Sequence, residues 1–172
     1  MAIALYDLSV ASFQQTVGAI AGVMERGLAH CTDNNIDPQS IVEARLHHDM
    51  LPFAFQIASV VHHSIGAIEG VQKGVFSPDT NFDGDYKTLQ KKLADASAAL
   101  AALTPGDVNK LEGKDVTFQF RDFKIPFVAE TFLLSFSLPN LHFHATTAYD
   151  ILRTKGVPLG KRDYLGQLRM KP

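Results

Sequence analysis

Three long stretches of the chain carry no charged side chain, and this feature constrains the fold more than any other. Residues 8–24, 50–68 and 131–149 run for 17, 19 and 19 residues without Asp, Glu, Lys or Arg. Of the 172 residues, 46% are hydrophobic and 20% are charged, whereas a disordered chain would be rich in charge and poor in apolar residues. We therefore predict one folded domain, residues 1–172, in which these stretches are buried.

The stretches are too polar for the hydrocarbon core of a membrane, which a helix spans with about 20 predominantly apolar residues. Polar side chains interrupt each of them, among them Gln14, Gln15, His62, His63, Asn140 and His144. We predict buried helices of a soluble protein with no membrane partner. No basic residue precedes the first apolar run, as it would in a secretory signal. The single cysteine, Cys31, excludes a disulfide framework and a zinc site made of cysteines alone. Together these features predict the cytoplasm.

Four segments show helical periodicity or helix boundary signals. Residues 5–30 place apolar side chains at steps of three and four. Asp37 and Pro38 form a helix start, a capping carboxylate followed by proline, and predict a second helix that runs to Lys73 with a bend at Pro52. A third, more solvated helix covers residues 86–103. The fourth spans residues 128–155 and is interrupted near a proline at position 139.

Alternating side chains over residues 116–121 indicate a short β-hairpin or extended insertion before the last helix. The fold class that we predict is therefore all-α: a four-helix bundle with this inserted β element.

Several polar residues do not fit a plain apolar core. At 100° per residue, Asp49, Gln56 and His63 lie on one flank of the second predicted helix, and His48 and His62 lie on its far side. On the fourth helix, Asn140, His144 and Thr147 share one face.

One interpretation of these residues is a divalent metal, Zn or Ni, held by His144 and one or two histidines of the second helix, among them His48 and His63. The alternative is that each histidine forms hydrogen bonds within the core or lies on the surface. Metal-binding helices usually supply two ligands at i and i+3 or i+4, but those positions after His144 are Thr147 and Ala148. In the adjacent pairs His47–His48 and His62–His63, only one member can face a given point of a regular helix.

The chain lacks the sequence motifs of several other catalytic classes. The chain has no G-x-S-x-G nucleophile elbow, no phosphate loop of Walker spacing and no paired carboxylates in an apolar setting. Residues 153–172 hold 6 basic and 1 acidic side chains, against 10 and 17 in residues 1–152. Because aromatic residues are scarce in this basic tail, we predict contacts with the helix end and the acidic body rather than with nucleic acid.

Two motifs resemble an uncharacterised domain-of-unknown-function family of the DinB/YfiT-like superfamily. They are Arg45-Leu46-x-x-Asp49-Met50-x-Pro52-x-x-x-Gln56 and Pro139-Asn140-x-x-Phe143-His144-x-x-Thr147-Ala148-Tyr149. The resemblance covers essentially the whole chain. It implies an up-down-down-up four-helix bundle, commonly a homodimer, and no established activity. Members of the superfamily that bind metal use one histidine of the second helix and an H-x-x-x-H pair on a later helix. His144 matches the first position of that pair, and Ala148 stands at the second.

Two hypotheses for function follow. In the first, the protein is a small enzyme, or a degenerate relative of one, with a ligand pocket between helices two and four that is lined by Asp49, Gln56, Asn140, His144, Thr147 and Tyr149. His144 would serve there as a metal ligand or general base. In the second, the bundle has no catalytic role, and the same polar residues form a network that fixes how the helices pack.

Overall fold

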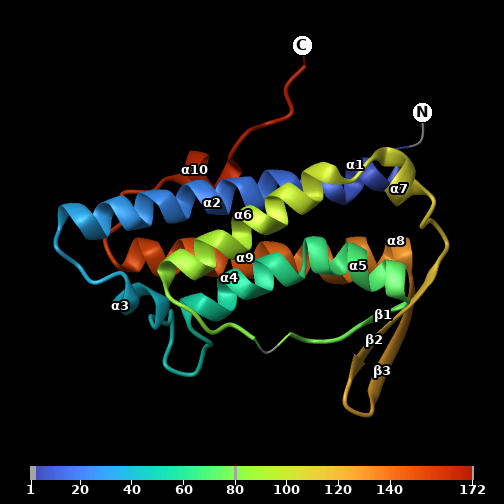
Figure 1. The fold of residues 1–172 in the computed structure, drawn as a ribbon, viewed down its shortest axis with the longest axis horizontal. Helices are drawn as coiled ribbons and strands as arrows, with labels where there is room; N and C mark the ends of the chain where they lie inside the picture. Colours follow the sequence, from blue (N-terminus) through green and yellow to red (C-terminus); the bar gives the residue numbers. More distant parts are fainter. Residues whose placement is uncertain (1–2, 80, 172) are drawn as a thin grey trace.

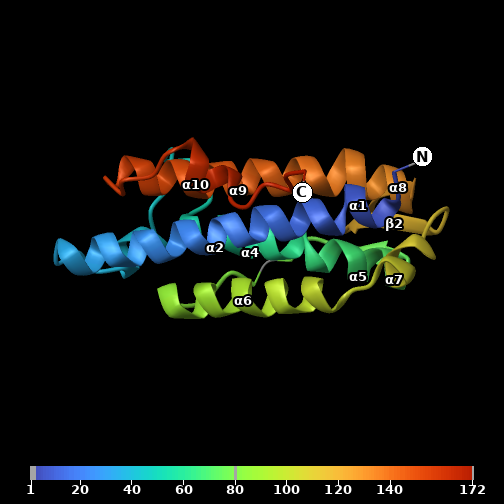
Figure 2. The ribbon, with the colours of Figure 1, turned by 90° about the horizontal axis from the view of Figure 1, so that it is seen from above.

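The computed structural model describes residues 3–79 and 81–171, and its main feature is a bundle of long helices (Figures 1 and 2). The bundle consists of α2 (Val10–Asp33), α4 (Phe53–His62) followed by α5 (Ile65–Lys73), α6 (Tyr86–Ala102) and α9 (Leu138–Thr154). Short helices join or flank these: α1 (Leu5–Leu8), α3 (Gln39–Val42), α7 (Pro105–Asn109), α8 (Ala129–Thr131) and α10 (Lys161–Leu165). The predicted helical bundle is thus confirmed. No helix among the described residues is both long and apolar enough to cross a membrane.

The first uncharged stretch forms most of α2, and its apolar stripe is buried. Phe13, Val17 and Ile20 are fully inaccessible to solvent, as the spacing of three and four residues predicts. A break at Ser9 separates α1 from α2, and the Ser9 hydroxyl donates to the Leu5 carbonyl over 2.6 Å.

The prediction of a continuous helix over residues 38–73 is wrong. Helix α3 ends at Val42, and residues 43–52 form a loop before α4 starts. Pro52 lies at the N-cap of α4 and does not bend a longer helix. The physical reason is that proline disfavours the helical conformation in the residue before it and has no N–H to donate. The Phe53 N–H instead donates to the Ala44 carbonyl over 2.8 Å, which closes the base of the loop.

The last helix is distorted rather than broken near Pro139. A π-helical segment, η1 (Phe132–Ser137), leads directly into α9, and Pro139 lies in the first turn of α9. Proline cannot donate to a carbonyl of the preceding turn, and a widened π turn is a common way for a helix to continue past such a defect. Together η1 and α9 hold the third uncharged stretch.

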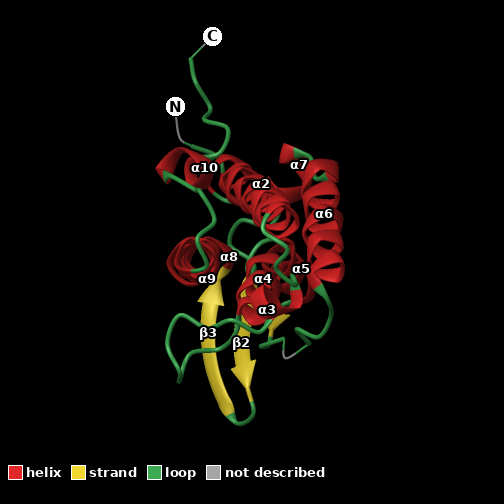
Figure 3. Ribbon diagram, turned by 90° about the vertical axis from the view of Figure 1, so that its left-hand side faces the viewer, coloured by secondary structure: helices red, strands yellow, loops and turns green. Residues whose placement is uncertain are grey.

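The predicted hairpin is formed by β2 (Asp115–Phe120) and β3 (Phe123–Val128), which pair antiparallel with Phe118 opposite Ile125. A two-residue strand that was not predicted, β1 (Val75–Phe76), adds to β2 in parallel. Figure 3 shows that the hairpin projects away from the helices. Its base packs on the bundle, where the rings of Phe127 and Phe132 lie 5.8 Å apart.

Helix α2 packs closely against α6 and α9 at Gly27. A Cβ at this position would lie 2.5 Å from the Tyr86 hydroxyl and 3.0 Å from Leu152. That hydroxyl is held by its hydrogen bond to the Met24 carbonyl. We expect Gly27→Ala to lower the free energy of unfolding by about 1–3 kcal/mol, measured by urea denaturation.

Gly22 of the same helix provides the matched control, because a Cβ placed there has no atom of the described residues within 4 Å apart from its chain neighbours and the backbone of its own helix. Gly22→Ala should raise stability by up to about 1 kcal/mol through helix propensity alone. Equal effects of the two substitutions would contradict this account of the packing.

Candidate functional site

A hydrogen-bonded pair of side chains links α4 to α9. His144 Nδ1 lies 2.8 Å from Gln56 Oε1, and the Gln56 amide nitrogen donates to the Leu51 carbonyl over 2.9 Å. Since that amide nitrogen serves the carbonyl, Oε1 is the atom that accepts from His144. His144 Nδ1 therefore carries the hydrogen, and Nε2 keeps its lone pair.

Two phenylalanine rings flank the imidazole of His144, Phe55 from α4 and Phe143 from α9. The imidazole meets the ring of Phe55 edge-on, with centroids 5.6 Å apart, and that of Phe143 at 5.3 Å. Burial lowers the pKa of His144 from 6.5 to about 4. At neutral pH the imidazole is therefore uncharged, and its lone pair is available without the loss of a proton.

His63 lies beside His144. The two ring centroids are 5.8 Å apart and the ring planes are nearly parallel, at 14°. His63 is 9% exposed, and its Nδ1 is buried without a hydrogen-bond partner among the described residues. Burial lowers its pKa to about 3, and the neighbouring imidazoles of His62 and His144 contribute to the shift. The site thus contains a second neutral imidazole with an unsatisfied polar atom.

Three further predicted residues of α9 make other contacts. The Asn140 amide donates to the Phe136 carbonyl over 2.7 Å, and the Thr147 hydroxyl to the Phe143 carbonyl over 2.8 Å. Both bonds lie within one helical turn. The ring of Tyr149 packs near that of Tyr164, at 6.1 Å.

Asp49 and His48 lie in the exposed loop between α3 and α4, not on a helix. Asp49 Oδ1 pairs with His47 Nδ1 over 2.5 Å, and the ring of His48 lies 4.2 Å from that of His47. Of the predicted site residues, the structure therefore brings together Gln56, His63 and His144. It places His48 and Asp49 in a second, separate group.

Sequence reasoning missed two features of the site. The ring of Phe55 lies against that of His144, and neither of the two motifs singles out Phe55. The ring of His62 stacks on Phe76 at 4.2 Å, and its Nε2 lies 2.8 Å from the Ser77 carbonyl. The strand that holds Phe76 is too short for any pattern to reveal.

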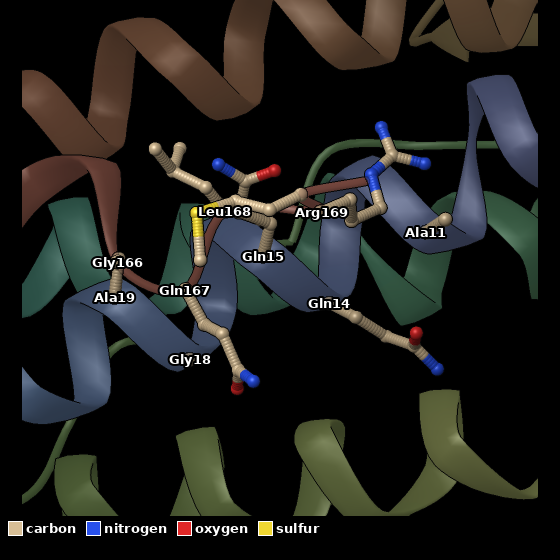
Figure 4. Close-up of a pocket in the computed structure, with 10 residues that line it drawn as sticks. Ala11, Gln14, Gln15, Gly18, Ala19, Gly166, Gln167, Leu168 and Arg169 are labelled. Atoms are coloured by element: carbon tan, nitrogen blue, oxygen red, sulfur yellow. The ribbon is translucent and has the colours of Figure 1, made fainter. Parts of the chain in front are cut away.

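A groove of about 520 Å³ lies elsewhere, between α2 and the C-terminal tail (Figure 4). Its lining includes Gln14, Gln15 and Gly18 of α2, with Gln167 and Arg169 of the tail. Gln15 donates to the Leu165 carbonyl over 2.9 Å, so the groove forms where the tail is fastened to α2. It shares no residue with the His63–His144 pair.

Comparisons with known proteins agree on the fold. The family model described as Domain of unknown function (DUF1993) matches residues 5–165. Among solved structures, a DinB family member protein from Shewanella denitrificans is similar, with a TM-score of 0.82 and 23% sequence identity over 98% of this chain and 95% of that one. No curated protein matches the chain. At this identity the likeness concerns the fold, a DinB-like helical bundle.

The buried neutral histidines predict a pH dependence of stability. Below pH 6.5 the unfolded chain takes up protons at both histidines, whereas the folded protein takes them up only near pH 4 and pH 3. Stability should therefore fall between pH 6.5 and 4, by at most about 1.4 kcal/mol per pH unit for each histidine. Urea denaturation at pH 7, 6 and 5 measures this slope.

The variant with both His63→Leu and His144→Gln isolates the contribution of this pair, because glutamine can still donate to Gln56. Its stability should fall less steeply with decreasing pH than that of the unmodified protein. Equal slopes for the two proteins would show that the histidines do not cause the dependence.

Proposed function

The chain belongs to the family described as Domain of unknown function (DUF1993), and from this premise we propose that it binds a divalent transition-metal ion, zinc or nickel, between α4 and α9. His144 and His63 are the ligands that we assign. The observation that carries the proposal is the hydrogen-bond chain from the Leu51 carbonyl through Gln56 to His144. A histidine that binds a metal through one ring nitrogen commonly donates the N–H of its other ring nitrogen to an oxygen in this way.

The low pKa of His144 favours a metal ligand over a general base. An imidazole of pKa about 4 is a weak base at pH 7, because catalytic bases work best when their pKa is near the working pH. A metal ligand needs only an unprotonated nitrogen, and His144 provides one throughout the neutral range.

His63 is suited to act as the second ligand because no group among the described residues forms a hydrogen bond with its buried Nδ1. The lone pairs of imidazole lie in the ring plane, and the two planes are now nearly parallel. For both histidines to bind one ion, one of the rings must therefore turn. Rotation of the His63 ring about its Cβ–Cγ bond breaks no hydrogen bond of Nδ1 among the described residues.

The chain supplies fewer ligands than the resemblance implies. Ala148, where a third ligand would stand, is fully buried in the core. Two imidazoles fit a site whose other positions are open to water or a small-molecule ligand. A metal bound there would polarise such a ligand as a Lewis acid, while Gln56 would hold the His144 ring in place.

The proposal extends to the topology of the bundle. We propose the up-down-down-up arrangement, which is supported by the course of the ribbon in Figure 1. There α5 and α6 run in the same direction, and the segment that joins them returns along the bundle. The homodimer and the cytoplasmic location stay predictions.

Removal of His144 provides the direct test. After dialysis against Zn²⁺ or Ni²⁺, elemental analysis should find about one ion per chain fewer in His144→Ala than in the unmodified protein. Gln56→Leu keeps both ligands and should weaken binding about 10-fold, because the ring loses its orienting partner.

His142→Ala is the matched control. His142 lies two residues away on the same helix, is exposed and pairs with Tyr164, so its loss should leave the metal content unchanged. If His144→Ala and His142→Ala, both folded by circular dichroism, hold equal amounts of metal, the proposed site is wrong.

A second candidate function is structural, and the same hydrogen bond favours it. Among the described helices, α4 and α9 form the most extensive contact, and the bond between Gln56 and His144 joins them. Gln56 is 2% exposed, so its amide would lose a hydrogen bond that water does not readily replace. In this role the pair fixes how the two helices align.

A double-mutant cycle measures the structural contribution. In protein treated with a chelator, Gln56→Ala and His144→Ala should show a coupling energy of about 1 kcal/mol. The exposed pair His142 and Tyr164, joined over 3.2 Å, should show a coupling energy of only a few tenths of a kcal/mol. Equal coupling in the two pairs would contradict a structural role for the buried bond.

A further inference from the structure

The loop between α3 and α4 brings three metal-binding side chains together at the surface. His47, His48 and Asp49 each offer a ligand atom, and these atoms all lie within 4.8 Å of one another. All three residues are exposed, the side chains of His47 and Asp49 at 60% and 72%. A solvated ion therefore has direct access to the group.

Adjacent histidines converge here because the segment is not helical. On a regular helix, neighbouring side chains diverge by about 100°, and only one can face a given point. In the loop, a turn in which the Met50 N–H donates to the His47 carbonyl over 3.0 Å folds the backbone back on itself. The rings of His47 and His48 consequently lie 4.2 Å apart.

The loop is braced from both ends, which limits the freedom of the three side chains. The Phe53 N–H donates to the Ala44 carbonyl over 2.8 Å and closes the base. Across the loop, the Arg45 guanidinium donates to the Met50 carbonyl over 2.5 Å. Preorganised donors lose less conformational entropy when they bind an ion.

From this geometry we propose a second metal site at His47, His48 and Asp49, which takes a late first-row divalent cation such as Zn²⁺, Ni²⁺ or Cu²⁺. Two imidazoles and one carboxylate suit these ions, whereas Mg²⁺ prefers oxygen ligands. The ion takes the place of the hydrogen bond between His47 Nδ1 and Asp49 Oδ1; the Nδ1 proton passes to solvent and Nε2 takes one up, so that His47 binds as the neutral Nε2–H tautomer. Water or an external ligand completes the coordination.

This site and the one assigned under the proposed function use different side chains. His63 and His144 belong to α4–α5 and α9 and donate no atom to the surface group. Variants of the two sites therefore separate their contributions, and either proposal can fail while the other stands.

Calorimetric titration of the full chain with Zn²⁺ tests the site. In a His63→Ala/His144→Ala background, one Zn²⁺ per chain should still bind. Addition of His47→Ala and His48→Ala should abolish this binding, and addition of Asp49→Asn alone should weaken it at least 10-fold. Mg²⁺ at the same concentration should give no heat of binding.

His142→Ala in the same background controls for loss of a surface histidine and should leave the affinity unchanged. Since the loop substitutions are exposed, circular dichroism should show no change in helix content. With Ni²⁺, the amide resonances of residues 45–51 should broaden selectively. The proposal is overturned if the background protein binds no Zn²⁺, or if it binds equally well without His47 and His48.

Discussion

Pro52 starts α4, and the position of both candidate metal sites depends on that constraint. Because proline has no N–H to donate and disfavours a helical residue before it, Leu51 is not helical and α4 begins at Phe53. The carbonyl of Leu51 is thereby left outside α4, where the Gln56 amide donates to it. The same loop lets adjacent histidines meet, which a continuous helix would forbid.

The hydrogen bond between Gln56 and His144 satisfies two polar side chains at the largely apolar interface between α4 and α9. Burial disfavours the charged form of both imidazoles, and this lowers the pKa of the half-buried His144 to about 4 and that of the buried His63 to about 3. His144 satisfies its N–H through Gln56, but the Nδ1 of His63 has no hydrogen-bond partner among the described residues. A buried polar atom without a partner is destabilising, and a bound ion at the proposed site would offset that cost.

Sequence patterns predicted the bundle because most helices bury a continuous stripe. Residues 5–30 and 86–103 were placed within a few residues, since Phe13 and Leu93 are buried as periodicity requires. The pattern failed over residues 43–52, where Leu46 lies at helical spacing from Met50 and Phe53 but is 40% exposed. The sequence placed both Gln56 and Asp49 in one predicted pocket with His144, yet only Gln56 lies beside His144. Only the end of the helix at Val42 separates Asp49 from Gln56, and no local signal marks that end.

The loop connects the two proposed sites physically. Asp49, a proposed ligand at the surface, is two residues from Leu51, whose carbonyl orients Gln56. An ion at the surface would fix the backbone of residues 47–49 and so restrict the position of that carbonyl. The carbonyl in turn determines which atom of the Gln56 amide faces His144, and hence which nitrogen of the imidazole carries the hydrogen. A surface ion would thus stabilise the tautomer of His144 in which Nε2 is free to bind.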